Sequence, residues 1–127
     1  MLAVSRRAGT AFVVGSAMLV SCGFVGGGQA VSVQGGDPER GAELIASFGC
    51  GSCHIIPGIE AADGVVGPPL TDVGRRRFIA GKLRNRPENL VRWLIDPQAI
   101  EPGTAMPNLG LSEEQARHVA AYLFTLL

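Results

Sequence analysis

The chain has 127 residues, a length that suits a single domain, and it carries 11 basic and 11 acidic side chains. Its formal net charge is therefore zero, and about −2 once Arg6 and Arg7 are removed with a leader. Nucleic-acid-binding domains carry a clear basic excess, so the charge balance argues against nucleic acid as a partner.

The N-terminus has the pattern of an export signal. Arg6 and Arg7 form a basic start, and residues 8–20 are mostly apolar over the length of a signal peptide. The sequence Leu-Val-Ser-Cys-Gly around Cys22 resembles a bacterial lipoprotein box, in which the cysteine becomes the lipidated N-terminus. We therefore expect residues 1–22 to be a signal peptide with a lipobox, and the protein to lie on the periplasmic side of a bacterial membrane.

The sequence also allows two other outcomes for the leader, ordinary cleavage or retention as a membrane anchor. Residues 28–30 read Gly-Gln-Ala, a small-x-small cleavage site, and cleavage near Ala30 would release a soluble periplasmic protein. Residues 8–25 are 18 in number, the lower end of membrane-spanning length, so an uncleaved anchor is the third option.

Residues 23–36 are rich in glycine and lack charge, which predicts a flexible linker spanning roughly 20 Å. A domain at residues 37–127 follows. Asp37 and Pro38 suit the N-cap and first position of a helix that should end near Ser47, before Gly49.

The motif that carries most information is Cys-Gly-Ser-Cys-His at residues 50–54. This C-x-x-C-H pattern is the attachment signature of a c-type haem, with two thiols for the vinyl groups and a histidine for the iron. A redox dithiol or half of a zinc site is the alternative. Zinc needs four ligands, and His118 is the only other histidine.

The elements after the motif are loops and helices. Residues 55–69 predict a loop, residues 70–74 a short helical turn, and residues 87–96 an amphipathic helix that ends before Pro97. No strand pattern is convincing.

The last helix opens with Ser112, and Gln115 three residues later completes a capping box. Its buried stripe, from Ala116 to Leu127, leaves His118 outside, so we expect a surface histidine. The fold class is therefore all-α, with three main helices.

Met106 is the only methionine beyond the leader, and it lies in a polar loop with Pro102 and Pro107. A thioether is a soft ligand, and Met/His is the cytochrome c pairing of axial ligands. The alternative is a methionine that fills a gap in the core.

Taken in order, these pieces resemble the class I c-type cytochromes over most of residues 37–127. The resemblance rests on Gly41 and Ile45, the motif at 50–54, Gly-Pro-Pro-Leu at 67–70, Gly74 and Arg75, the helix at 87–96, the loop at 102–107 and Tyr122. It implies the cytochrome c fold around one haem c, covalently attached through Cys50 and Cys53.

The resemblance also implies roles for single residues. His54 would be the proximal iron ligand and Met106 the distal one. The carbonyl of Pro68 would accept a hydrogen bond from His54. Gly41 would let the first helix cross closely against Tyr122.

Further contacts to the haem follow from the same resemblance. Trp93 would pack against a haem face, and Arg75 and Asn85 would contact the propionates. Six basic residues occur at positions 75, 76, 77, 82, 84 and 86. We interpret them as a solvated loop, with a docking patch as the alternative.

The function that follows is single-electron transfer, not enzymatic catalysis, between redox partners of a bacterial respiratory chain. Candidate partners are a quinol-cytochrome c reductase, a terminal oxidase or a periplasmic dehydrogenase. The chain could instead be a fixed electron-transfer subunit of a membrane complex, or a haem enzyme or sensor whose distal iron position is open.

Overall fold

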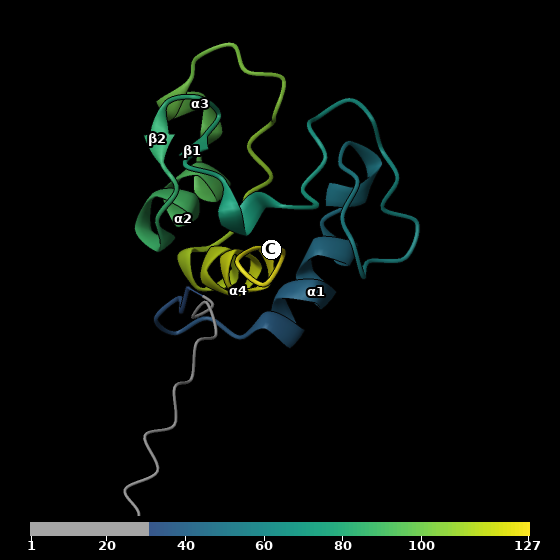
Figure 1. Cartoon of the computed structure of the whole chain (residues 1–127). Coiled ribbons are helices and arrows are strands. Elements are labelled where there is room, and N and C mark those ends of the chain that lie inside the picture. The colour runs from purple at the N-terminus through teal and green to yellow at the C-terminus, as the bar shows by residue number, and fades with distance from the viewer. Residues whose placement is uncertain (1–30) are drawn as a thin grey trace, which may run out of the picture.

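The computed structural model describes residues 31–127, in which helices supply most of the regular structure (Figure 1). The α-helices are α1 (Pro38–Ser47), α2 (Pro87–Ile95), α3 (Pro97–Ile100) and α4 (Glu113–Leu123). Two single 3₁₀ turns are η1 (Cys50–Ser52) and η2 (Val73–Arg75), and a small antiparallel hairpin is formed by β1 (Phe78–Ile79) and β2 (Leu83–Arg84). The expected three main helices are α1, α2 and α4.

Local side-chain bonds begin the helices as the sequence predicts. The Asp37 carboxylate accepts hydrogen bonds from the backbone N–H groups of Glu39 and Arg40, and Pro38 opens α1. The Ser112–Gln115 capping box of α4 is present with both of its bonds. These bonds satisfy N–H groups that the helix itself leaves unpaired.

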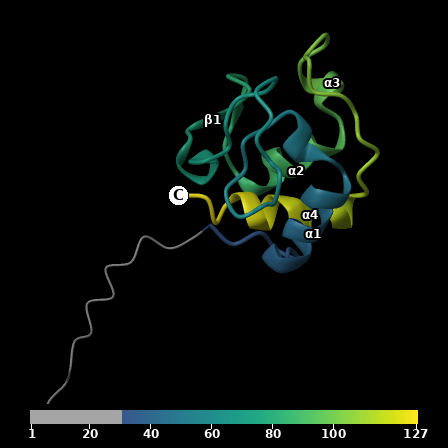
Figure 2. The same ribbon diagram turned by 90° about the vertical axis from the view of Figure 1, so that its right-hand side faces the viewer.

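The helix α1 crosses α4 at a very short distance because Gly41 has no side chain there. A Cβ atom on Gly41 would lie 2.1 Å from the His118 carbonyl oxygen and 2.9 Å from the Tyr122 Cβ. The views in Figures 1 and 2 show the two helices in contact below the loops. The predicted approach of Gly41 to Tyr122 is therefore present.

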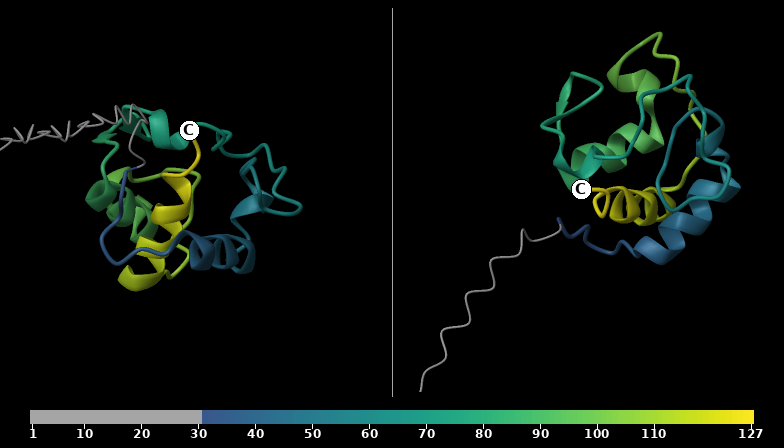
Figure 3. Two further views of the ribbon diagram at one scale, coloured as in Figure 1. Left: turned by 60° about the horizontal axis from the view of Figure 1, so that its bottom comes forward. Right: turned by 45° about the vertical axis from the view of Figure 1, so that its right-hand side comes forward.

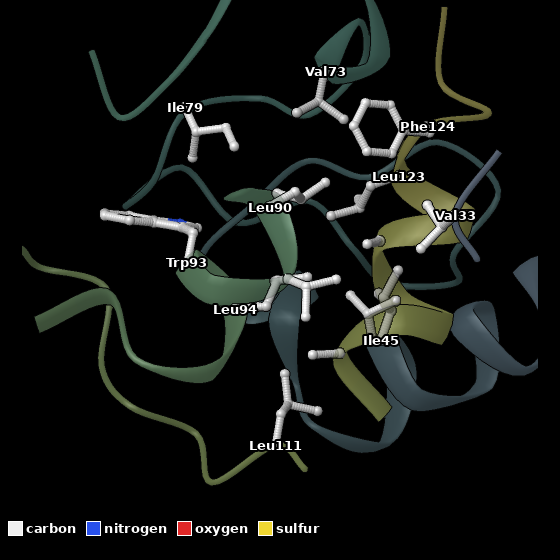
Figure 4. Close-up of a cluster of buried hydrophobic side chains, with 14 of the residues drawn as sticks. Val33, Ile45, Val73, Ile79, Leu90, Trp93, Leu94, Leu111, Leu123 and Phe124 are labelled. Atoms are coloured by element: carbon white, nitrogen blue, oxygen red, sulfur yellow. The ribbon is translucent and has the colours of Figure 1, made fainter. Parts of the chain in front are cut away.

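The hydrophobic core lies where α2 and α4 meet and continues onto α1. Figure 4 shows Leu90 of α2 facing Leu123 of α4, with Leu94 one turn further along α2. Val73 from η2 lies beside the ring of Phe124, and so joins the C-terminal segment to this core (Figure 4).

His118 is buried, so the expectation of a surface histidine is wrong. Its side chain is 8% exposed, and its Nδ1 accepts a hydrogen bond of 3.0 Å from the backbone N–H of Asp37. The apolar stripe of α4 predicts only which face of the helix turns toward the main core. The start of α1 covers a second face of α4, and His118 lies on that face.

The packed domain also begins before Asp37. Val33 is buried, and a guanidinium nitrogen of Arg117 donates to the carbonyl of Gln34 over 3.2 Å. A Cβ atom on Gly36 would lie 2.6 Å from the Arg117 carbonyl oxygen. Of the linker expected at residues 23–36, Val33 and Gln34 thus lie against α4, while residues 23–30 fall outside the described residues.

We predict that His118→Leu destabilises the folded protein by about 1–2 kcal/mol, because the partly buried Asp37 N–H loses its acceptor while the apolar packing volume stays similar. Thermal unfolding followed by circular dichroism measures the effect. His118→Asn, which keeps an acceptor, should lose less, and equal stability of the Leu variant would contradict the role given to this bond.

Candidate functional site

A cavity of about 440 Å³ opens between α1, α2, α4 and the loops that connect them. This volume lies within the usual range of ligand sites. Its floor is apolar, with side chains from three helices: Ile45, Leu90, Leu94, Val119 and Leu123. In Figure 3 (right) the loops form a ring above α4 and α1.

The two thiols reach the wall of this cavity through a tight turn after α1. Gly49 has a φ of 68°, the left-handed conformation that ends the helix, and η1 follows at once. The N–H groups of Cys53 and His54 both bond to the carbonyl of Cys50, at 3.2 and 3.1 Å. Cys50, Cys53 and His54 therefore line the same cavity.

Within the part of the chain that the structure describes, the thiols of Cys50 and Cys53 form no disulfide. Burial raises the pKa of the Cys50 thiol, and the neighbouring Cys53 adds to the effect. Unmodified Cys50 is thus a neutral thiol at pH 7, a form compatible with an apolar wall.

His54 is held in orientation by the next loop. Its Nδ1 lies 2.8 Å from the carbonyl oxygen of Pro68, so Nδ1–H donates and Nε2 keeps its lone pair for a metal. A Cβ atom on Gly67 would lie 2.3 Å from the His54 Cε1, and the Gly67 N–H bonds to the Cys53 carbonyl over 2.7 Å. Only glycine fits this close passage beneath the ring.

Met106 enters the cavity from the loop that follows α3. The loop is fastened by Gln98, whose Nε2 donates to the carbonyls of Thr104 and Met106 at 2.8 and 3.0 Å. The Gln98 Oε1 accepts from the Gly103 N–H at 3.0 Å. The sequence analysis did not identify Gln98, because an amide in a four-residue helix gives no periodic or motif signal.

The other residues predicted to contact the haem are Trp93, Arg75 and Asn85, and they differ in whether they line the cavity. Trp93 of α2 is buried and lines the cavity. Arg75 is exposed and does not line it, whereas the adjacent Arg76 does, with its Nη2 2.6 Å from an Asp72 carboxylate oxygen. Asn85 donates to the Val73 carbonyl over 2.7 Å, and its buried Oδ1 has no hydrogen-bond partner within residues 31–127.

The cavity fits a covalently attached haem. It is apolar, it presents two free thiols and an oriented imidazole from one turn, and it presents a thioether from a separate loop. Over residues 31–127, no group of three or more His, Cys, Asp or Glu side chains lies where it could hold a metal ion. Cys22 lies outside the described residues.

Comparison with known proteins gives the family. The Cytochrome c family profile matches residues 38–127. The chain is 38% identical over 89 residues to cytochrome c oxidase subunit 2 of Alkalihalophilus pseudofirmus, a match covering 69% of this chain and 25% of the relative. It is 35% identical over 101 residues to cytochrome c-type cyt cy of Rhodobacter capsulatus, covering 72% and 50%.

A relative of similar size is cytochrome c-552 of Bradyrhizobium diazoefficiens, 30% identical over 90 residues, with 71% of this chain and 75% of the relative covered. The oxidase subunits are much longer, and the chain spans about a quarter of their length. The matched region, the helical fold and the thiol-lined cavity together show that the chain belongs to the cytochrome c family, as a class I c-type cytochrome that carries haem c through Cys50 and Cys53.

Proposed function

We propose that the chain carries single electrons between respiratory redox proteins, with His54 and Met106 as the two axial ligands of the haem iron, and that it is not itself an enzyme. The observation that carries this proposal is that both side chains line one apolar cavity together with the two attachment thiols. The family supports an electron carrier, and the two ligands define how it works.

When bound, haem c supplies an iron that alternates between Fe(III) and Fe(II). The chain's own residues fix the surroundings of that iron. Pro68 holds the His54 ring, and Gln98 holds the backbone on either side of Met106. Leu90, Trp93 and Leu94 of α2 exclude water from the cavity wall, and an apolar wall with methionine ligation favours the reduced state.

A filled distal position also suppresses chemistry on substrates. With Met106 as ligand, no site is open for oxygen or peroxide, which separates a carrier from a haem enzyme or sensor. Partners should be redox proteins such as a quinol-cytochrome c reductase, a terminal oxidase or a periplasmic dehydrogenase, with small and transient interfaces.

A second candidate is a fixed electron-transfer subunit of a membrane oxidase, reductase or dehydrogenase complex. The similarity to cytochrome c oxidase subunit 2 proteins favours this reading. Purification in mild detergent distinguishes the two: a free carrier separates from large complexes, and a fixed subunit co-purifies with one in constant ratio.

The spectrum and mass of the exported protein test the proposal. We expect one added haem mass, a low-spin spectrum in both redox states and the far-red charge-transfer band of a ferric methionine-ligated haem. Colourless protein without added mass would refute the carrier function, and a coloured protein without that band would refute Met106 as ligand.

We propose further that the protein is exported and held at the membrane by a lipid on Cys22. No helix within residues 31–127 has both the length and the apolar character that a bilayer crossing requires.

We predict that Cys22→Ser moves the protein from the membrane fraction to the soluble periplasmic fraction, because the lipidated thiol is lost. Haem absorbance and immunoblots of both fractions measure this. Membrane association that persists in the variant would contradict lipidation and favour an uncleaved leader helix or a tightly bound partner.

A further inference from the structure

A dense group of cations surrounds the β1–β2 hairpin. This basic hairpin comprises residues 75–86, with Arg75, Arg76, Arg77, Lys82, Arg84 and Arg86, all exposed except the half-buried Arg76. Two carboxylates pair with it: Asp72 with Arg76, and Glu101 with Lys82 over 3.0 Å. Within residues 31–127 the other four guanidinium groups have no carboxylate partner at ion-pair distance.

The backbone holds these cations on an ordered scaffold. The Asn85 N–H bonds to the Arg77 carbonyl over 3.0 Å, and the Lys82 N–H closes the turn onto Ile79 over 2.9 Å. Arg84 stacks over the ring of Phe78 at 5.3 Å, and Phe78 also lines the cavity assigned to the haem. The hairpin therefore holds its arginines in a fixed arrangement beside the mouth of that cavity.

The described chain enters the fold on the same side as this hairpin. Figures 2 and 3 show that the segment leading into α1 begins close to the C-terminus, and the Gly74 N–H bonds to the Leu126 carbonyl over 2.8 Å. Gly74 belongs to η2, which leads directly into the basic hairpin.

The chain between Cys22 and the first buried residue, Val33, is short. Only residues 23–32 separate them, and ten residues reach at most about 35 Å. Residues 31–36 lead into the start of α1. There, three acidic residues (Asp37, Glu39 and Glu43) accompany one basic residue, Arg40. Of the surfaces near the entry point, the basic hairpin is therefore the one that complements negative charge.

From the entry point and this charge pattern, we propose that the basic hairpin docks onto the anionic phospholipid headgroups of the membrane that anchors the chain. Docking turns η2 and the hairpin toward the bilayer and restricts how the tethered domain rotates. The proposal rests on the membrane anchoring proposed above and is independent of which residue is the distal iron ligand.

The test uses the membrane-anchored, haem-loaded full chain in phosphatidylcholine vesicles, with or without phosphatidylglycerol and with a trace of headgroup-labelled fluorescent lipid. The haem quenches the label by energy transfer, so quenching reports the height of the domain above the bilayer. We expect quenching to be about twofold stronger with phosphatidylglycerol, because clustered arginines are attracted to an anionic surface. The increase should vanish at high salt, where the screening length falls from about 10 Å at 0.1 M to about 3 Å at 1 M.

Two charge-matched variants locate the contact. Arg77→Glu should lose at least about half of the lipid-dependent quenching, and Arg40→Glu on α1 should keep it, although both change the net charge equally. Each protein preparation is matched for haem absorbance and for the mass of its N-terminal lipid. A loss of the haem or of the lipid anchor is therefore detected independently of docking. Equal quenching in the two vesicle types, or equal losses in the two variants, would overturn the proposal and leave an acidic protein as the partner to test.

Discussion

Met106→Ala should remove the far-red charge-transfer band of the ferric protein and open the iron to added ligands such as cyanide or carbon monoxide. The reduction potential should fall on the order of 100 mV, because loss of the thioether removes the ligand that favours Fe(II). Absorption spectra and a redox titration measure both effects. The expectation follows from the position of Met106 on the cavity wall, in a loop whose backbone is bound by Gln98.

Leu109→Ala is the matched control for this variant. Leu109 lines the same cavity and comes from the same loop, so its loss removes a similar apolar contact without removing sulfur. The control should keep the charge-transfer band and the low-spin spectrum. An unchanged spectrum in Met106→Ala would show that another residue binds the iron, and loss of the band in both variants would indicate a collapsed loop.

Gly41→Ala should destabilise the folded protein, although alanine is the better helix former by about 1 kcal/mol. The new Cβ would lie 2.1 Å from the His118 carbonyl oxygen, so α1 and α4 must move apart. Such overpacking costs about 1–3 kcal/mol, which lowers the melting temperature of a domain of this size by roughly 5–15 °C. Thermal unfolding of the haem-loaded protein measures the shift.

Ala46→Gly, on the exposed side of the same helix, tests whether ordinary helix propensity holds in α1. It should cost about 1 kcal/mol through propensity alone. A stabilised Gly41→Ala protein beside a destabilised Ala46→Gly protein would mean that propensity, not the helix crossing, dominates at Gly41.

The helices and the attachment turn could be predicted because their signals are local. Asp37 with Pro38, and Ser112 with Gln115, are caps whose bonds span only a few residues, and the structure contains them. The helix α2 ends at Ile95, one residue before the predicted end, because Pro97 opens the separate helix α3. The cysteine motif likewise brings its ligands together within a single turn.

Features that depend on contacts between distant segments could not be predicted in this way. His118 is buried by the start of α1, and its bond to Asp37 spans 81 positions of the chain. The β1–β2 hairpin has two residues in each strand, too few for an alternating pattern. Arg76 rather than Arg75 lines the cavity, a choice between neighbours that depends on the η2 turn and on Asp72.

The attachment of the N-terminal segment to α4 has a mechanical consequence. A pull on the N-terminal segment meets the buried Val33 and the Arg117–Gln34 bond before it reaches Asp37. Such a load therefore reaches α4 before it reaches α1 and the turn that presents Cys50 and His54.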